Sequence, residues 1–540
     1  VREVATPSLG ITHGLAAQPP PSRQCQMEMS KATQRSVARA STEFVGTLFL
    51  CLTVAMTGGT LIAPLAIGCA LMVVVYAGGH ISGGHYNPAV TLAVLLRGGG
   101  KIKTGEACIY VVCQLAGALC GAMLSWALIG WSLAAYPTPA LGANPFAACL
   151  CELMVTFALC SVVLHTTTTK AQADNSYYGL AIGFTVLSGA VAVGGISGGA
   201  FNPAVGFMPV LYGAHSASHS WVYWLGPLLG GALAGAAFRA MALEEYGGSP
   251  NEAMVKCAPR LVETIGTMML CFVVGTASLA QSFLAPLAIG SMLLAMICMG
   301  GAISGAHFNP AFTLAALLRT ELGATHKRFT WQQGAEYLLA QIVGAALGAL
   351  AAWGALETNR RVQYPTVPPT SGLGAGFLGE LVGTFLLVYV FLNVATTKDL
   401  AGNSFSGLAI GMVVTLMIAC MAPVSGGAFN PAVGLVGLFS GAGRVGIGSV
   451  WIYWVACPLG AIMATAFFRL QNGEEFGSKG ADVLAQAASA ASALEQALLP
   501  QGAGLGGTST APSTASPHWV QDYTVLQEAP SRDSLSNIAE

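Results

Sequence analysis

Charged residues are scarce in this sequence. Only 8% of its 540 residues are Asp, Glu, Lys or Arg, and 54% are hydrophobic, whereas an average soluble domain carries about 25% charged residues. This composition excludes a soluble domain with a large core and indicates a polytopic membrane protein surrounded by lipid bilayer. The net charge of −1 offers no basic surface for nucleic acid, so no nucleic-acid partner is expected.

Several chemical motifs are also missing. The 14 cysteines form no C-x-x-C pair and mostly lie within apolar runs, which favours packing roles over a metal site or a disulfide framework. There is no N-glycosylation sequon, and residues 1–40 lack the apolar segment of a signal peptide. No set of nucleophile, base and metal ligands recurs with suitable spacing, so we expect no enzyme, no metal and no cofactor.

Four copies of one tripeptide stand out against this background. They are Asn87-Pro88-Ala89, Asn202-Pro203-Ala204, Asn309-Pro310-Ala311 and Asn430-Pro431-Ala432. Each copy follows a Ser-Gly pair and opens an apolar run. Asparagine is a preferred helix N-cap, and proline suits the first helical position because its missing N–H would be unpaired there. Each copy therefore predicts the start of a short helix, and four copies in matched context argue against chance.

Twelve apolar stretches alternate with polar connections. They lie near residues 42–57, 61–79, 106–130, 146–166, 177–194, 221–243, 260–279, 283–302, 332–356, 375–395, 405–422 and 449–469. Most can cross a bilayer about 30 Å thick at about 1.5 Å per residue. The Asn-Pro-Ala segments follow the second and fifth stretches of each half and are too short to cross. Short, Pro-interrupted segments in matching positions predict re-entrant half-helices.

A carboxylate opens each quarter of this pattern. Glu43, Glu152, Glu263 and Glu380 each begin a Glu-x-x-x-Thr motif. Three spans per quarter turn the next quarter over, so consecutive quarters are inverted repeats. The expected domains are a disordered tail (1–40), a first bundle (41–243), a linker (244–258), a second bundle (259–470) and a flexible tail (471–540).

Basic residues mark one membrane face. On it lie Arg35, Arg39, Arg97, Lys101, Lys103, Lys170, Arg239, Lys256, Arg319, Lys327, Arg328, Lys398 and Arg469. Only Arg360, Arg361 and Arg444 fall on the opposite face. Because cytoplasmic loops are enriched in Lys and Arg, we expect a multi-pass membrane protein with both termini in the cytoplasm.

Two Asn-Pro-Ala loops per six spans, with Glu-x-x-x-Thr opening each quarter, resemble the major intrinsic protein (aquaporin and aquaglyceroporin) family. Further matches are Gln114, Gln341, Gly-Leu-Ala-Ile-Gly at 179–183 and 407–411, and Tyr223-Trp-Leu-Gly-Pro227. The second copy of the last motif departs, because Tyr453-Trp-Val-Ala-Cys-Pro458 shifts the proline by one position. The resemblance implies an all-α membrane protein with two channel bundles in tandem, each of six transmembrane helices and two half-helices.

The resemblance also implies roles for the motif residues. The four asparagines would lie near the bilayer midplane, where facing helix N-termini repel cations and protons. The four glutamates and the two glutamines would brace the pore loops as structural acceptors and donors, although intramembrane carboxylates can also serve a proton-coupled carrier. His85 and His307 either line the cytoplasmic vestibule or brace the loops.

The spacing of the family places a selectivity constriction at four positions in each half. These are Ile67, Ala190, Gly199 and Val205 in the first half, and Ile289, Ile418, Gly427 and Val433 in the second. Many water-selective members have arginine at Val205 and Val433, and often histidine at Ala190 and Ile418. Both pores are therefore expected to be apolar and to admit small neutral solutes.

Three functions remain open from the residues. The first is a passive channel for water and small uncharged solutes such as glycerol, urea, ammonia or hydrogen peroxide. The second is a secondary transporter of six plus six spans, which would need coupling charges at the midplane. The third is a structural membrane protein with closed pores. The family commonly forms four-pore tetramers, so we expect a dimer of this tandem chain.

Overall fold

All the regular structure in the described part of the chain is helical. The computed structural model describes residues 23–130, 132–213, 218–247, 252–277, 282–323, 329–356, 362–439, 448–476 and 489. In the first half the helices are α1 (Arg23–Thr57), α2 (Ala63–Ser82), α3 (Pro88–Arg97), α4 (Thr104–Ile129), α5 (Pro145–Thr168), α6 (Tyr178–Ser197), η1 (Val205–Phe207), α7 (Met208–Leu211), α8 (Val222–Met241) and η3 (Leu243–Tyr246).

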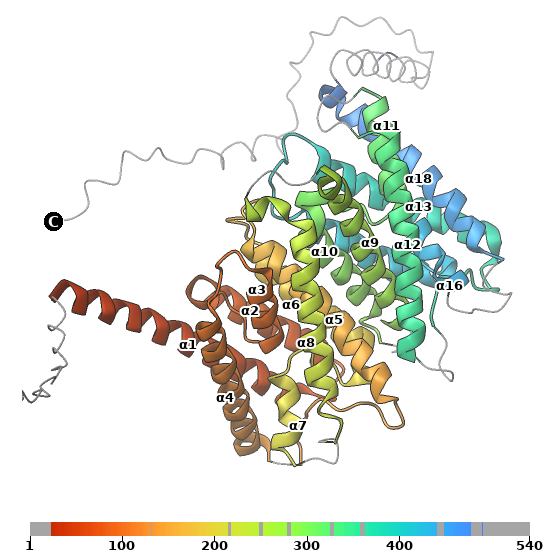
Figure 1. Cartoon of the computed structure of the whole chain (residues 1–540). Coiled ribbons are helices and arrows are strands. Elements are labelled where there is room, and N and C mark those ends of the chain that lie inside the picture. Colours follow the sequence, from red (N-terminus) through yellow and green to blue (C-terminus); the bar gives the residue numbers. More distant parts are fainter. Residues whose placement is uncertain are drawn as a thin grey trace, which may run out of the picture. The chain divides into compact units, whose positions relative to one another are not determined.

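The second half repeats this order (Figure 1). Its helices are α9 (Glu252–Ala277), α10 (Ala285–Ser304), α11 (Pro310–Glu321), α12 (Trp331–Leu356), α13 (Gly372–Thr396), α14 (Ser406–Ser425), α15 (Pro431–Gly434), α16 (Val436–Phe439), α18 (Val450–Gln471) and η5 (Gly473–Phe476). Eleven helices among the described residues are long and apolar enough to cross a membrane, and α8, with 20 residues, is a further long helix. The predicted all-α fold of two like bundles is confirmed.

Glycine brings the main helix pairs into close contact. Within each quarter the first long helix packs against the third: α1 on α4, α5 on α8, α9 on α12 and α13 on α18. A Cβ atom added to Gly121 on α4 would lie 2.6 Å from the carbonyl oxygen of Leu48 on α1. A Cβ atom on Gly460 of α18 would lie 2.6 Å from the carbonyl oxygen of Leu381 on α13. Without side chains at these positions the backbones can touch, as membrane helices often do.

The chain differs from the sequence expectation at two boundaries. The helix α1 begins at Arg23, so residues 23–40 are helical where composition predicted a disordered tail. The segment contains three Gln, three Ala, three Arg and two Met, which are good helix formers, and it extends a helix that is already nucleated. Similarly, α9 begins at Glu252, inside the expected linker 244–258. Residues 1–22 and most of the expected tail 471–540 lie outside the described residues.

The half-helices of the two loops in each half are unequal. The first ones, α3 and α11, are continuous helices of 10 and 12 residues. The second ones are broken: η1 and α7 follow Ala204, and α15 and α16 follow Asn430. Pro209 stands at the start of α7, where it fits the first turn of a helix but removes one backbone donor. The sequence predicted short helices here but not these breaks.

Buried ion pairs anchor the far ends of the longer half-helices. The Arg97 guanidinium at the end of α3 pairs with Glu245 at 3.1 Å, and the Arg319 guanidinium in α11 pairs with Glu475 at 2.9 Å. Both arginines are almost fully buried. We name the side of the bundles on which these pairs lie the basic face.

The two halves meet through six helices, α5, α6 and α8 of the first half and α9, α10 and α12 of the second. The helix α6 packs along α10, and α5 and α9 contact the same junction. Within it the Ser188 hydroxyl donates to the Ala288 carbonyl at 2.8 Å. At its edge the Tyr177 phenol donates to the Gln172 side chain at 3.0 Å. Gln172 in turn reaches the Met299 carbonyl of the second half at 3.5 Å.

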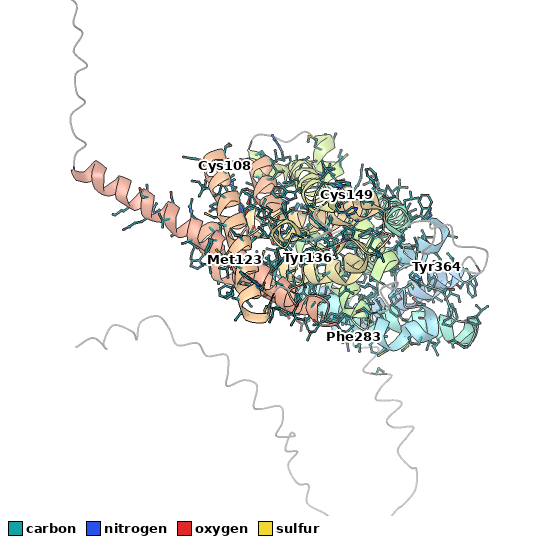
Figure 2. All side chains as sticks on the ribbon, turned by 90° about the horizontal axis from the view of Figure 1, so that it is seen from below. Cys108, Met123, Tyr136, Cys149, Phe283 and Tyr364 are labelled. Carbon is teal, nitrogen blue, oxygen red and sulfur yellow. The ribbon has the colours of Figure 1, made fainter. Side chains whose placement is uncertain are left out.

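Side chains fill the space between the helices (Figure 2). Figure 2 labels Tyr136 and Tyr364, which lie in matching connections before α5 and before α13. The Tyr136 ring stacks on Tyr212 with a centroid distance of 5.5 Å, and Tyr364 packs against Gly437. The tandem repeat therefore extends to the loops that cover the face opposite the basic face.

Candidate functional site

Two asparagines bind each other's loops at the centre of the first half. The Asn87 amide Nδ2 donates to the Phe201 carbonyl at 2.9 Å, and the Asn202 Nδ2 donates to the Tyr86 carbonyl at 2.9 Å. Both side chains are nearly fully buried. The reciprocal pair of bonds holds the N-termini of two half-helices that belong to different loops beside one another.

The second half repeats this arrangement. The Asn309 Nδ2 donates to the Phe429 carbonyl at 3.0 Å, and the Asn430 Nδ2 donates to the Phe308 carbonyl at 2.9 Å. In all four copies the asparagine Oδ1 accepts a bond of 2.9 Å from the N–H of the alanine two residues on. Asn87, Asn309 and Asn430 therefore cap their own half-helices, as predicted from residue type. Asn202 makes the same bond, but its first helical turn begins only at Val205.

A buried glutamate holds the backbone just before each asparagine. Glu43 accepts bonds from the Ser82 hydroxyl (2.6 Å), the His85 N–H (3.0 Å), the Tyr86 N–H (2.7 Å) and the Gln114 amide (2.8 Å). The other three glutamates, Glu152, Glu263 and Glu380, accept from the matching serine and from two matching backbone N–H groups. All four carboxylates are fully buried, and such groups must be paired to be tolerated.

Beyond the serine and the two backbone N–H groups, a further donor to the carboxylate differs between quarters. Gln114 and Gln341 donate to Glu43 and Glu263 at 2.8 and 2.9 Å, and each also donates to a threonine hydroxyl at 3.0 Å. In the fourth quarter the Cys457 thiol lies 3.6 Å from the Glu380 carboxylate and donates to it. Cys457 is the residue that the one-position shift of Pro458 introduces. The departure from the family motif thus supplies a donor to a carboxylate.

The two histidines make the loop-bracing contact that was one of the two alternatives from the sequence. The Nδ1 atoms of His85 and His307 lie 3.1 Å from the hydroxyls of Thr91 and Thr313, one turn into α3 and α11. Each imidazole also lines the central cavity of its own half. The histidines therefore brace the loops and contribute polar surface to the cavity.

Sequence reasoning missed the aromatic residue before each asparagine. Tyr86, Phe201, Phe308 and Phe429 all have positive φ angles of 48–50°, which is uncommon for a bulky residue and costs energy. Their N–H groups bind the glutamates and their carbonyls bind the opposite asparagines, so these contacts hold the strained backbone in place. The repeated aromatic residue before Asn is the signal that could have revealed them.

Small residues make room for these four rings. Tyr86, Phe308 and Phe429 fill the space beside Gly46, Gly266 and Gly383, the glycines of the Glu-x-x-Gly-Thr motifs. The second quarter has Val155 at that place, and there Gly189 on α6 supplies the missing room, because a Cβ atom on Gly189 would collide with Val155. Each quarter therefore keeps space for its aromatic ring, although the glycine that provides the space is not at the same position in every quarter.

A narrow cavity of about 20 Å³ surrounds the asparagine pair in each half. Ile67, Gly199 and Val205 line the first cavity, whereas Ala190 does not. All four matching positions, Ile289, Ile418, Gly427 and Val433, line the second cavity. The described residues contain no group of three or more His, Cys, Asp or Glu side chains placed to bind a metal.

We expect Glu43→Gln to destabilise the first bundle strongly. Both carboxylate oxygens face backbone or side-chain donors, so an amide in either orientation sets donor against donor. The expected loss is about 3 kcal/mol, the size of a charged hydrogen bond with a buried donor left unpaired. Thermal unfolding of the purified protein in detergent measures it.

Glu106→Gln is the matched control, because Glu106 forms its ion pair with Arg39 at a partly exposed site. Surface pairs contribute about 0–1 kcal/mol, so this variant should unfold close to the parent. Equal unfolding midpoints for the two variants would contradict the bracing role of Glu43.

Comparison with known proteins agrees with this geometry. The family model for the major intrinsic proteins matches residues 33–238 and again residues 252–468. Probable aquaporin TIP4-1 of Oryza sativa subsp. japonica is 37% identical over 184 residues, which cover 34% of this chain and 72% of the rice protein. Aquaporin TIP1-2 of Zea mays is 38% identical over 182 residues (33% of this chain, 70% of the maize protein), and aquaporin NIP1-1 of Zea mays is 35% identical over 185 residues (34% and 60%).

The alignment with each relative covers about a third of this chain, and the family model matches the chain twice. The members of this family are channels rather than enzymes, which agrees with the expectation from the sequence. The two matched regions carry the same helix order, the same asparagine pair and the same glutamate braces. The chain therefore belongs to the major intrinsic protein family and contains two of its domains in tandem.

Proposed function

We propose that each half of the chain is a passive channel for water and small uncharged solutes such as glycerol, urea, ammonia or hydrogen peroxide. The observation that carries the proposal is the asparagine pair in each cavity. Each asparagine uses one amide N–H to bind the opposite loop. A primary amide has two N–H donors, so the second can donate to the oxygen of a passing solute.

Exclusion of protons and ions follows from the same arrangement. Each half-helix N-terminus carries about half a positive charge, and the two asparagines of a half bring two such ends together. Cations are repelled there. A water molecule that accepts hydrogen bonds from both asparagines cannot also pass a proton along a continuous chain of waters.

The proposed constriction is apolar in both halves. Val205 and Val433 line the two cavities at the place where many water-selective members carry arginine. A wall without a fixed charge solvates water poorly and tolerates the carbon backbone of a neutral solute. The relatives named above are called aquaporins, which supports water as one of the permeants.

A carrier is not favoured by the contacts. Proton coupling would require a carboxylate that is free to exchange its proton during transport. The repeated glutamates are fully buried and each accepts at least three hydrogen bonds from the pore loops. Protonating one of them would remove the brace from its loop.

Solute uptake by proteoliposomes tests the proposal. Vesicles containing the chain should take up water, glycerol, urea and hydrogen peroxide faster than empty vesicles, with rates that rise linearly with concentration. An imposed proton gradient should change nothing. Saturation at low concentration, or uptake that follows the gradient, would instead support a carrier.

We further propose that the basic face is cytoplasmic and that both tails lie there. Lys170, Lys398, Arg239 and Arg469 support this, since they follow or end long helices on that side. Lys and Arg concentrate in cytoplasmic loops. Protease accessibility of the two tails in sealed vesicles of known orientation tests the assignment.

Two chains are proposed to form a ring of four pores. The junction within the chain buries α6 and α10: in their most apolar segments, 72% and 78% of the residues are buried. In the corresponding segments of α2 and α14, only 28% and 33% of the residues are buried. By the repeat, α2 matches α10 and α14 matches α6. A second chain can therefore cover both open faces by repeating the internal junction, which closes a two-fold ring.

A cross-link tests this dimer. Ser188 and Ala288 touch at the internal junction, and their repeat partners are Leu416 on α14 and Ala66 on α2. The cysteines that are exposed among the described residues, Cys108, Cys257 and Cys420, and Cys25 are first changed to serine. In that chain, Ala66→Cys with Leu416→Cys should give oxidised dimers and no larger species. Four chains per particle, or a ladder of oligomers, would contradict the closed ring.

A further inference from the structure

Two aromatic rings stack beside the second pore. The rings of Phe312 on α11 and Phe391 on α13 have a centroid distance of 4.2 Å and an angle of 9° between their planes. Both side chains are almost fully buried, and Phe312 lines the cavity that contains the asparagine pair of the second half.

The pair lies between that asparagine pair and the basic face. Phe312 is three residues after Asn309 on the half-helix that runs toward Arg319. Phe391 is five residues before Thr396, whose carbonyl accepts a bond of 2.9 Å from Arg319. Ile418, by contrast, comes from the constriction expected on the other side of the asparagines. The second pore is therefore lined by bulky side chains on both sides of its centre.

The first half has no such pair. The matching positions are Val90, three residues after Asn87, and Val163, which follows Glu152 at the distance at which Phe391 follows Glu380. Both valines line the first cavity, whereas Phe391 does not line the second. Phe312, with the Phe391 ring stacked against it, thus stands where the first half has two smaller valine side chains that face the cavity.

Neighbouring rings hold the pair in place. The centroids of the Phe391 and His307 rings are 5.8 Å apart. The His307 ring also contacts the rings of Phe329 and Tyr337, at centroid distances of 5.2 and 5.3 Å. Such edge-to-face contacts add to the burial energy of aromatic side chains. A ring packed in this way cannot swing aside without disturbing its neighbours, because protein interiors are close-packed.

We propose that Phe312 and Phe391 form a second constriction, found only in the second pore, which passes water and excludes polyols by size. The inference rests on the proposed channel function and adds a division of labour to it. The first pore then carries glycerol and larger neutral solutes, and the second carries water and solutes of similar size. No charged group takes part, so the discrimination is steric.

The test opens the second pore in a chain whose first pore is blocked by Asn87→Ala and Asn202→Ala. Adding Phe312→Val and Phe391→Val should raise glycerol permeability of proteoliposomes about tenfold, the effect of removing one modest steric barrier. Water permeability should change much less. Phe385→Val is the matched control and should leave both rates unchanged. Phe385 lies on the same helix as Phe391 and stacks on Tyr389 with a centroid distance of 6.1 Å, but it does not line the cavity.

The reciprocal variant guards against a folding defect. In the parent chain, Val90→Phe with Val163→Phe should remove most glycerol transport and spare water transport. Unchanged glycerol rates in both sets of variants, in a parent chain that conducts, would overturn this inference alone. A parent chain that transports no solute above empty vesicles would overturn the proposed channel function, and this inference with it.

Discussion

The Asn87→Ala, Asn202→Ala variant should lose nearly all glycerol transport while retaining part of its water transport. The substitutions remove both bonds that tie the two loops together and both donors at the centre of the first pore. The second pore keeps its own bonds. Because Ile418 and the stacked phenylalanines narrow that pore, the remaining flux should be mostly water. Stopped-flow light scattering of proteoliposomes measures both rates.

The mirror variant, Asn309→Ala with Asn430→Ala, should keep glycerol transport and lose only part of the water flux. Asn144→Ala is the matched control, since Asn144 also precedes a proline and caps a long helix by accepting from Phe146. Its loss costs about 1 kcal/mol of capping and should leave both rates unchanged. If the first double variant abolishes all transport while the chain still reaches the membrane, the two pores are not independent.

Ala190→Ile should make the first pore resemble the second at the expected constriction. Ala190 is too short to line the first cavity, whereas Ile418 lines the second. With the second pore blocked, the added side chain should lower the glycerol-to-water permeability ratio about tenfold, because each step of about 1.4 kcal/mol in a barrier changes a rate tenfold. Val205→Arg should shift the ratio further toward water, since it narrows the pore and restores a strong donor.

The reciprocal substitution Ile418→Ala completes this test. Alone it should raise glycerol flux through the second pore only slightly, since Phe312 and Phe391 remain; combined with their replacement by valine it should raise the flux further. Equal glycerol-to-water ratios in two conducting halves, unaffected by Ala190→Ile, would rule out Ala190 and Ile418 as determinants of selectivity.

Local rules were enough to predict much of this fold. Apart from the N-terminal extensions of α1 and α9, the long helices lie within a few residues of the apolar stretches, because a span must be both long and apolar to cross a bilayer. Asn87, Asn309 and Asn430 cap half-helices, as the preferences of Asn and Pro predict. The inverted repeat follows from three spans per quarter, and the twofold family match agrees with it.

Features that depend on contacts between distant residues could not be predicted in the same way. The positive φ of Tyr86 depends on Glu43 and Asn202, which lie far from it in the sequence. Likewise, nothing local distinguishes Phe312 from other apolar residues of a half-helix; only its stacking on Phe391 gives it significance. The helical start of α1 at Arg23 was not predicted, because the polar composition of residues 1–40 indicated disorder and the helix propensity of residues 23–40 was not considered.

The central claim is that one chain carries two independent pores. The most direct test measures osmotic water permeability of proteoliposomes containing, at equal density, the parent chain, each asparagine double variant and the variant with all four asparagines replaced. The account predicts that the rates of the two double variants, corrected for bare lipid, add up to that of the parent, and that the quadruple variant equals empty vesicles. A double variant that already equals empty vesicles, or a quadruple variant that still conducts, would contradict it.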